Sequence, residues 1–275
     1  MTTIALLGAG GKMGMRLARN LKNSRFTIRP VEINAQAQQK IKSEFGWDCL
    51  DRSSALIDAD IVIMAVPDTV IGLVANEIVP TLCAGTILVI LDAAAPHAGH
   101  LPHRDDITYF VTHPCHPPIF NDETDPAAKS DHFGGIAAKQ HIVNALMQGP
   151  EEHYDLGEEV ARAIWAPVMR SHRITVEQMA ILEPGLSETV CATLLSAMRE
   201  AMDESIRRGV PKEAARDFLL GHMNILAAVT FEEINGQFSD ACNKAIVFGK
   251  ETIFKPDWLR LFEPEEIKNS VKRIT

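Results

Sequence analysis

The chain has 275 residues, which at roughly 150 residues per domain predicts about two domains. Lys and Arg number 27 against 36 Asp and Glu, and the formal charge of −9 argues against nucleic acid or an anionic membrane surface as a partner. Hydrophobic residues make up 46%, enough for a large core, yet no stretch reaches the roughly 20 consecutive apolar residues of a membrane helix.

Two features concern the cellular compartment. The N-terminal sequence MTTIALLGAGGKMG has no charged region ahead of its apolar run, so we expect no signal peptide. An odd number of cysteines without a CxxC pair is typical of reduced thiols rather than of disulfides or a zinc site. We therefore expect a cytoplasmic protein. The cysteines are Cys49, Cys83, Cys115, Cys191 and Cys242.

Short apolar runs alternate with amphipathic stretches from the N-terminus to about residue 115. This alternation predicts a parallel sheet with right-handed crossovers, a doubly wound α/β arrangement. The predicted strands cover residues 3–8, 26–32, 59–67, 85–93 and 107–114, and the predicted helices cover Met13–Leu21, Ala35–Phe45 and Val70–Thr81.

The second half of the chain reads as mainly α-helical. A turn-rich segment, PPIFNDETDPAAKSDHFGG (117–135), predicts a crossing loop, and strand signals stop after Tyr154. One long helix is expected from Ile174 to Gly209, where apolar residues recur at every fourth position, and a second helix follows from Lys212. We expect a dinucleotide-binding domain over residues 1–150 and a helical substrate and dimerisation domain over residues 151–275.

The segment GAGGKMG (8–14) joins the first predicted strand to the first predicted helix. Backbone without Cβ atoms can approach a pyrophosphate, and the free N–H groups at a helix start bind its charge. A strict GxGxxG motif would need glycine at position 13, where this chain has methionine. The predicted cofactor-binding residues of this loop are Gly8, Gly10, Gly11, Lys12, Met13 and Gly14.

Glu32 ends the second predicted strand. A carboxylate at that place can bind both ribose hydroxyls and repels a 2′-phosphate, so it favours NAD over NADP. The alternative is a solvated residue at a strand end. Val66, Pro67 and Asp68 close the next buried strand and are expected to line the cofactor crevice, although Asp68 serves equally well as a helix N-cap.

The segment THPCHPP (112–118) follows the last predicted strand of the first domain. Its prolines make it a rigid extended loop, which would hold His113 and His116 near the expected nicotinamide. Two such imidazoles suit proton transfer or metal binding. The alternative is a pair of exposed loop histidines.

The segment ILEPGLSETV (181–190) places proline and glycine inside the long predicted helix, where they cost about 3 and 1 kcal/mol. A bend there would let Glu183 and Glu188 point into one cleft. Together with His116 they would form a site for Mg²⁺, Mn²⁺ or Ca²⁺. The alternative is a kinked core helix with solvated glutamates.

The segments GAGGKMG, THPCHPPIFNDE, ILEPGLSETV and FSDACNKAIVFGK together resemble the D-apionate oxidoisomerases, Rossmann-fold oxidoreductases with a phosphogluconate dehydrogenase-like C-terminal domain. The resemblance covers nearly the whole chain. It implies NAD-dependent oxidation of the sugar acid D-apionate, rearrangement to 3-oxo-isoapionate, and an entwined homodimer. A divalent metal on His116, Glu183 and Glu188 would polarise the carbonyl, and His113 would accept a proton or contact the substrate, with Glu188 also serving catalysis.

Two other functions remain open. One is a simple NAD-dependent hydroxy-acid dehydrogenase of the 6-phosphogluconate or 3-hydroxyisobutyrate type, without rearrangement. Those enzymes carry a catalytic lysine on the corresponding helix, and this chain has no lysine between Ile174 and Gly209. The other is a non-catalytic NAD-sensing regulator, which would need no cluster of carboxylates and imidazoles.

Overall fold

The computed structural model describes residues 1–274. The chain forms two compact units, Met1–Leu182 together with the C-terminal residues from Lys268, and Glu183–Ile267. Within the described residues, none of the helices combines the length and apolar character that crossing a membrane requires.

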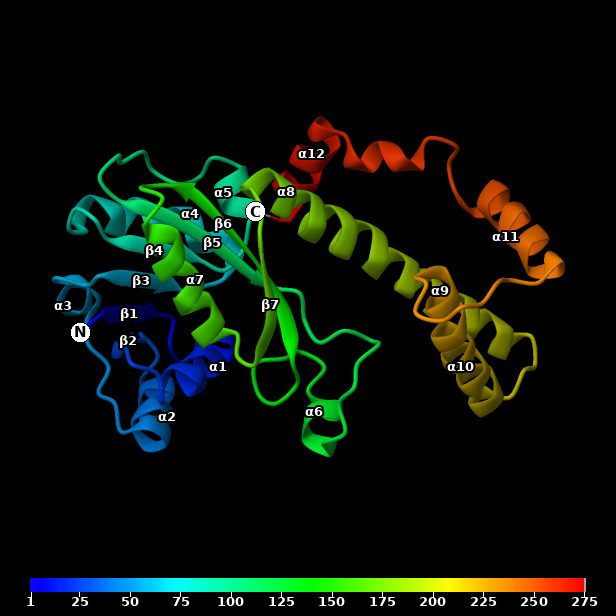
Figure 1. The fold of residues 1–275 in the computed structure, drawn as a ribbon, viewed down its shortest axis with the longest axis horizontal. Helices are drawn as coiled ribbons and strands as arrows, with labels where there is room; N and C mark the ends of the chain where they lie inside the picture. The colour runs from blue at the N-terminus through cyan, green and yellow to red at the C-terminus, as the bar shows by residue number, and fades with distance from the viewer. Residues whose placement is uncertain (275) are drawn as a thin grey trace. The chain divides into compact units, whose positions relative to one another are not determined.

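The first unit is built on a sheet that, within residues 1–274, has seven strands in the order β2-β1-β3-β4-β5-β6-β7 (Figure 1). Neighbouring strands are parallel from β2 to β5, which confirms the predicted doubly wound arrangement. β6 runs antiparallel to β5, and β7 is parallel to β6. The strands are β1 Thr3–Leu7, β2 Thr27–Val31, β3 Ile61–Met64, β4 Ile87–Ile90, β5 Thr108–Pro114, β6 Gln140–Gln148 and β7 Val168–Arg173.

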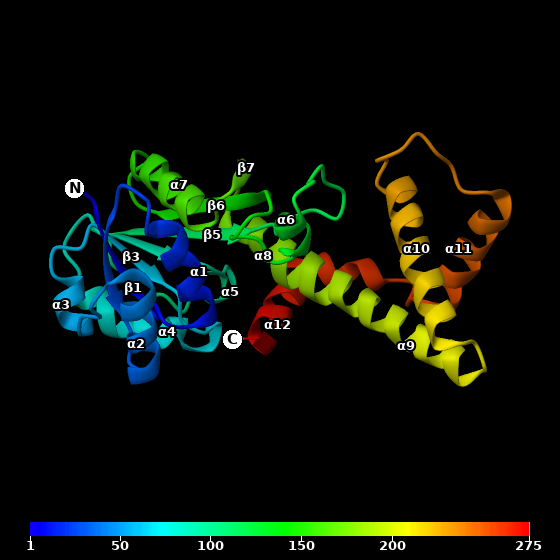
Figure 2. The ribbon, with the colours of Figure 1, turned by 90° about the horizontal axis from the view of Figure 1, so that it is seen from below.

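Helices cover both faces of this sheet, as the continuous apolar strands require. In β3, Ile61 and Ile63 face one core cluster, and Val62 and Met64 face the other. Figure 2 shows α7 on one side of the strands and α4 on the other. The helices of this unit are α1 Lys12–Leu21, α2 Ala35–Phe45, α3 Arg52–Leu56, α4 Asp68–Ile78, α5 Ala94–His97, α6 Pro126–Ser130, α7 His153–Ile164 and α8 Val176–Ala180.

The sheet continues further along the chain than the sequence predicts. We expected strand signals to stop after Tyr154, and that expectation is wrong, because β7 lies beyond it. β7, with the sequence VMRSHR, is an edge strand whose residues are exposed or partly exposed, so it lacks the apolar run that marks a buried strand. The expected domain boundary at residue 150 falls between β6 and α7, inside the first unit.

The second unit is helical. The single helix expected from Ile174 to Gly209 is instead α8, a π-helical segment over Ile181–Ala192, and α9 over Thr193–Arg207. Pro184 lacks an N–H, and its carbonyl accepts a hydrogen bond from the Thr189 hydroxyl, 2.5 Å away. Hydrogen bonds in a π-helix run from residue i to i+5, so this segment departs from the regular α-helix that the sequence pattern predicts. The other elements are α10 Lys212–Thr230, α11 Asp240–Ile253, a 3₁₀ turn Trp258–Phe262 and α12 Pro264–Ile274, whose last residues belong to the first unit.

The helices of the second unit leave their apolar side chains uncovered. In the described chain, α9 and α11 have no buried residue, and α10 buries only Ala215 and Ala228. Phe218 and Phe248 are each 69% exposed. A helix with apolar side chains normally buries them against another element.

Candidate functional site

The glycine loop forms a tight turn between β1 and α1. Gly8 has φ +74°, and its carbonyl oxygen accepts a hydrogen bond of 3.1 Å from the Gly11 N–H. A Cβ atom on Gly14 would lie 2.1 Å from the same oxygen, so the turn cannot hold a larger residue there. Gly11 is the N-cap of α1 and offers no side-chain oxygen to the first helical N–H groups. These amides remain available to an anion such as pyrophosphate.

Glu32 is held by backbone amides rather than being solvated at a strand end. Its Oε2 accepts from the Gly10 N–H at 2.9 Å, and its Oε1 accepts from Ile33 and Asn34 at 2.8 and 2.9 Å. A Cβ atom on Gly10 would lie 2.7 Å from Oε2. The glycine therefore lets the carboxylate reach the loop, and its negative charge is fixed at the end of β2.

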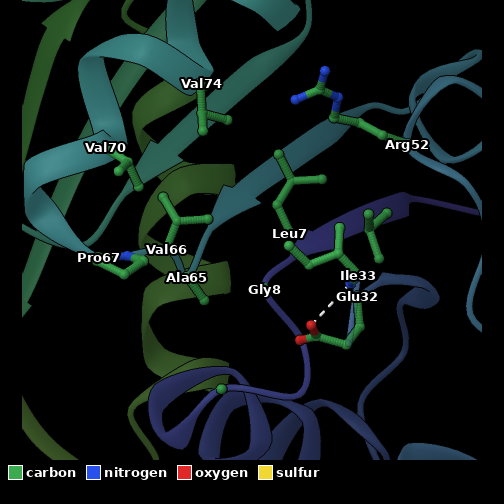
Figure 3. A pocket seen from close by; sticks show the side chains of 12 residues that line it. Leu7, Gly8, Glu32, Ile33, Arg52, Ala65, Val66, Pro67, Val70 and Val74 are labelled. Carbon is green, nitrogen blue, oxygen red and sulfur yellow. Dashed lines mark hydrogen bonds between the residues drawn. The ribbon is translucent and has the colours of Figure 1, made fainter. Parts of the chain in front are cut away.

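A pocket of about 360 Å³ lies beside this carboxylate (Figure 3). One wall is apolar and comes from the end of β3 and from α4, with Val66, Val70 and Val74. Opposite are Glu32 and Ile33, and Ile33 is 97% exposed. The volume lies in the range of small-molecule sites, and its wall suits a flat apolar group.

A second pocket of about 330 Å³ shares Ala65, Val66, Pro67 and Gly11 with the first. Lys12, Met13, Asp68, Asp92 and His113 also line it. Both pockets therefore open at the carboxyl ends of the parallel strands, where ligands bind in sheets of this kind.

The predicted cofactor residues lie around these two pockets. Gly8, Gly11, Lys12, Met13, Glu32, Val66, Pro67 and Asp68 line one or the other, Gly10 binds Glu32, and Gly14 lies under the turn. Asp68 is the first residue of α4, whose N-cap is Pro67, so the expectation that Asp68 could be the cap is wrong. Its partial burial, and next the nearby Asp92, raise the pKa of Asp68, while His113 acts in the opposite direction.

His113 and His116 come from the end of β5, and their ring centroids lie 6.0 Å apart. The Nδ1 atoms lie 2.9 Å from the Pro114 carbonyl oxygen and 2.8 Å from that of Phe133. A carbonyl oxygen only accepts, so each neutral ring carries its proton on Nδ1 and keeps a lone pair on Nε2. Burial lowers the pKa of His116, which favours this neutral form.

The loop that contains Phe133, whose carbonyl oxygen lies 2.8 Å from the His116 Nδ1, is anchored to α1. The buried carboxylate of Asp131 accepts hydrogen bonds of 2.9 to 3.2 Å from backbone N–H groups of residues 134, 136, 137 and 138. The guanidinium of Arg16 lies 4.4 Å from the Phe133 ring centroid and donates to the Gly134 carbonyl. The segment that reads as a crossing loop in the sequence is thus a fixed support for one imidazole.

Asp92 is a site residue that the sequence reasoning missed. It follows β4, and its Oδ1 accepts from the Ala94 N–H at 2.6 Å. One of its oxygens lies within 4.8 Å of a ring nitrogen of His113. The available signal was its position directly after a buried strand, at the same sheet edge as His113.

The two predicted glutamates lie on the π-helical segment. Glu183 is the first residue of the second unit and follows Leu182 in the helical run that continues from α8. Glu183 is partly exposed, and Glu188 is exposed in the described chain.

Comparisons with known protein families match a cofactor-binding domain to the first part of the chain and a dehydrogenase C-terminal domain to the second. The profile of the acetohydroxy acid isomeroreductase NADPH-binding domain matches residues 1–119, and that of the phosphogluconate dehydrogenase (decarboxylating) C-terminal domain matches residues 121–275. An NADH-preferring ketol-acid reductoisomerase from an uncultured archaeon, 19% identical with a TM-score of 0.67 over 99% of this chain and 82% of its own, shares the fold.

Closer relatives cover the whole chain. D-apionate oxidoisomerases from Rhizobium rhizogenes and Cupriavidus necator are 66% and 64% identical, over 100% and 99% of both chains. A solved structure described as a semialdehyde dehydrogenase NAD-binding protein from Cupriavidus necator, in complex with calcium and NAD, is 63% identical with a TM-score of 0.98 over the full length of both chains. The chain belongs to the D-apionate oxidoisomerase family.

Proposed function

We propose that the protein is an NAD-dependent oxidoreductase that oxidises D-apionate and rearranges the product to 3-oxo-isoapionate. The observation that carries the proposal is the pairing of Asp92 with His113 in the second pocket, at the end of the cofactor crevice. The substrate is taken from relatives named for this activity, at 66% and 64% identity.

Glu32 supports NAD as the cofactor. Its carboxylate is fixed by three backbone N–H groups beside the first pocket, where a ribose would meet it. A ribose with two hydroxyls can donate to that carboxylate, whereas a 2′-phosphate would meet a like charge. A relative solved in complex with NAD agrees with this choice.

We propose that Asp92 and His113 hold a divalent cation, with Glu183, which the sequence predicts as a metal ligand, as the third ligand. A carboxylate oxygen of Asp92 lies within 4.8 Å of a ring nitrogen of His113. Two carboxylates and a neutral imidazole fit a divalent cation, which when bound would polarise a substrate carbonyl as a Lewis acid.

The ligand set expected from the sequence, His116, Glu183 and Glu188, shares Glu183 with this group and stays as the alternative. In the first assignment the His116 Nε2 accepts the proton of the substrate hydroxyl, because its Nδ1 is committed to the Phe133 carbonyl. In the second, His113 accepts that proton and Glu188 assists. The two assignments predict different effects of single substitutions on metal binding.

We further propose a homodimer formed through the helical unit. α9 and α11 bury none of their side chains in the described chain, although both carry large apolar ones. A second copy would cover them. A cytoplasmic location also stays a proposal, supported by the cysteines, which are all free.

The test follows NADH formation from NAD⁺ and D-apionate, with and without a chelator, and identifies the product by mass and NMR. Metal-dependent NADH formation together with a rearranged 3-oxo acid is the expected result. Turnover of unbranched hydroxy acids that ignores the chelator, with D-apionate inert, would instead establish the simple dehydrogenase.

A further inference from the structure

Arg52 lines the first pocket and has no part in the function proposed above. It is the first residue of α3 and lines the pocket together with Ile33, Val70 and Val74 (Figure 3). Its Nη1 lies 2.7 Å from Oε2 of Glu77 on α4. The ion pair thus joins two elements that border the same pocket.

The backbone on either side of this ion pair is fixed. The Leu50 N–H donates to the Pro30 carbonyl at 2.9 Å, which ties the segment before α3 to β2. Asp51 caps α3 by accepting from the Ser54 N–H at 2.9 Å, and hydrogen bonds from the Ser53 and Ser54 side chains, with that of the Ser54 amide, hold its pKa well below the ordinary value. On the other side, α4 is anchored in the core by Ile71, Ala75 and Ile78.

The pocket has the walls that a purine ring needs. Ile33 is 97% exposed beside the carboxylate that would bind the ribose, and the valines of α4 form the apolar wall. A flat ring would cover these side chains, and a guanidinium stacks on such a ring better than an ammonium does. Many exposed ion pairs contribute little to stability, and this pair differs from them in that Arg52 lines the pocket.

We propose that Arg52, held in place by Glu77, stacks on the adenine ring of the bound dinucleotide. Arg52 is then a binding residue for the adenosine half of the cofactor, and Glu77 is a positioning residue. The inference rests on the proposed function only in requiring that an adenine dinucleotide occupies the crevice. It does not depend on the substrate, the cation or the rearrangement.

The test uses the full chain and measures binding by calorimetry for NADH, AMP and nicotinamide mononucleotide. We expect Arg52→Ala to weaken the binding of NADH and of AMP by the same factor, about tenfold. The affinity for the mononucleotide should be unchanged. Arg52→Lys should recover only part of this loss, and Glu77→Gln should cost less than Arg52→Ala because the guanidinium itself remains. Arg25→Ala, which removes an exposed ion pair with Glu159 elsewhere in the unit, is the matched control and should change none of the three affinities.

Several results would overturn the inference. AMP affinity that is unchanged by Arg52→Ala, or an equal loss for the mononucleotide, excludes stacking on adenine. A titration with NADPH is run alongside, and a loss of affinity confined to NADPH would make Arg52 a ligand for a 2′-phosphate instead. If the unaltered protein binds neither NADH nor AMP, both this inference and the proposed function fail, whereas binding without turnover of D-apionate removes the proposed function alone.

Discussion

At the scale of single residues, carboxylates of similar chemistry have different tasks because their partners differ. Asp131 is 6% exposed and receives four backbone N–H groups, which makes it a structural anchor. Glu32 receives three but stays at a pocket wall. Asp92 accepts a hydrogen bond from the Ala94 N–H and lies beside His113 in the second pocket. Burial and position thus distinguish the carboxylate that supports a loop from the two that line pockets.

Replacing Glu32 tests the cofactor choice. We expect Glu32→Gln to raise KM for NAD⁺ by about tenfold or more and to narrow the preference for NAD⁺ over NADP⁺, because the charge facing the ribose is removed. Steady-state kinetics with both cofactors measure this. Glu44→Gln, which alters an exposed pair with Arg19, should leave both values unchanged. A preference for NAD⁺ that survives in Glu32→Gln contradicts the assignment.

Asp131→Asn should destabilise the first unit by about 2–3 kcal/mol, because an amide NH₂ would face backbone N–H groups. Burial alone would raise the pKa of Asp131. Its hydrogen bonds from backbone N–H groups outweigh burial and lower that pKa, and the donors are Ala137, Ala138, Ile136 and Gly134. A lowered folded-state pKa means that the stabilisation is full above the unfolded value, about 4, and is lost as the pH falls further. The difference in the free energy of unfolding between the unaltered protein and Asp131→Asn, measured in urea, should therefore shrink below that pH. Asp122→Asn, at an exposed pair with Lys139, should cost under about 0.5 kcal/mol, and an equal cost at both sites would refute the argument.

Single substitutions decide between the two ligand sets. We expect Asp92→Asn and His113→Gln each to weaken Ca²⁺ or Mn²⁺ binding by at least about tenfold, since each removes one ligand. His116→Gln and Glu188→Gln should leave the metal affinity nearly unchanged. Calorimetric titration of the NAD-loaded protein measures this, and the reverse pattern would favour the set expected from the sequence.

At the scale of elements, the glycine loop works because α1, α2 and the end of β2 approach one another closely. A Cβ atom on Gly10 would lie 2.5 Å from the Cβ of Ala37 on α2, in addition to its contact with Glu32. Contacts this short force one element to move. The crevice therefore depends on the packing of three elements and not on the loop alone.

Gly10→Ala should lower NAD affinity by about tenfold or more while the protein stays folded, because the displaced carboxylate no longer meets the ribose. Fluorescence titration with NADH measures the affinity, and circular dichroism checks the fold. Adding Ala37→Gly removes one of the two close contacts and should restore part of the binding. A double variant no better than Gly10→Ala would show that the Ala37 contact is irrelevant.

At the scale of the whole molecule, the two units differ in how their helices are covered. α1 and α4 place buried residues against the sheet, whereas α9 and α11 in the described chain bury none. Apolar side chains such as Ile246, Val247 and Phe248 remain exposed on α11. Burial of apolar area is the main stabilising term in association, so a second copy is the expected cover.

Sedimentation equilibrium should therefore find a dimer, and Phe248→Asp should weaken it by at least about tenfold, since a charge would enter an apolar interface. Lys250→Ala, on the same helix, removes a charge without adding one and should leave the dimer intact. A monomer at micromolar concentration of the unaltered protein would show that the homodimer proposal is wrong.

The sequence by itself determined the doubly wound sheet, the position of the glycine loop and the position of Glu32 at the end of the second strand. Each of these follows from a period or spacing within a short stretch of contiguous residues. It also pointed to the histidines after β5 and to the bend near Pro184, where α8 gives way to a π-helical segment. Only the tertiary structure placed Asp92 beside His113, tied His116 to the loop anchored by Asp131, and added the edge strand β7. These contacts join residues far apart in the chain, and they arise from strand order and burial, which no local pattern encodes.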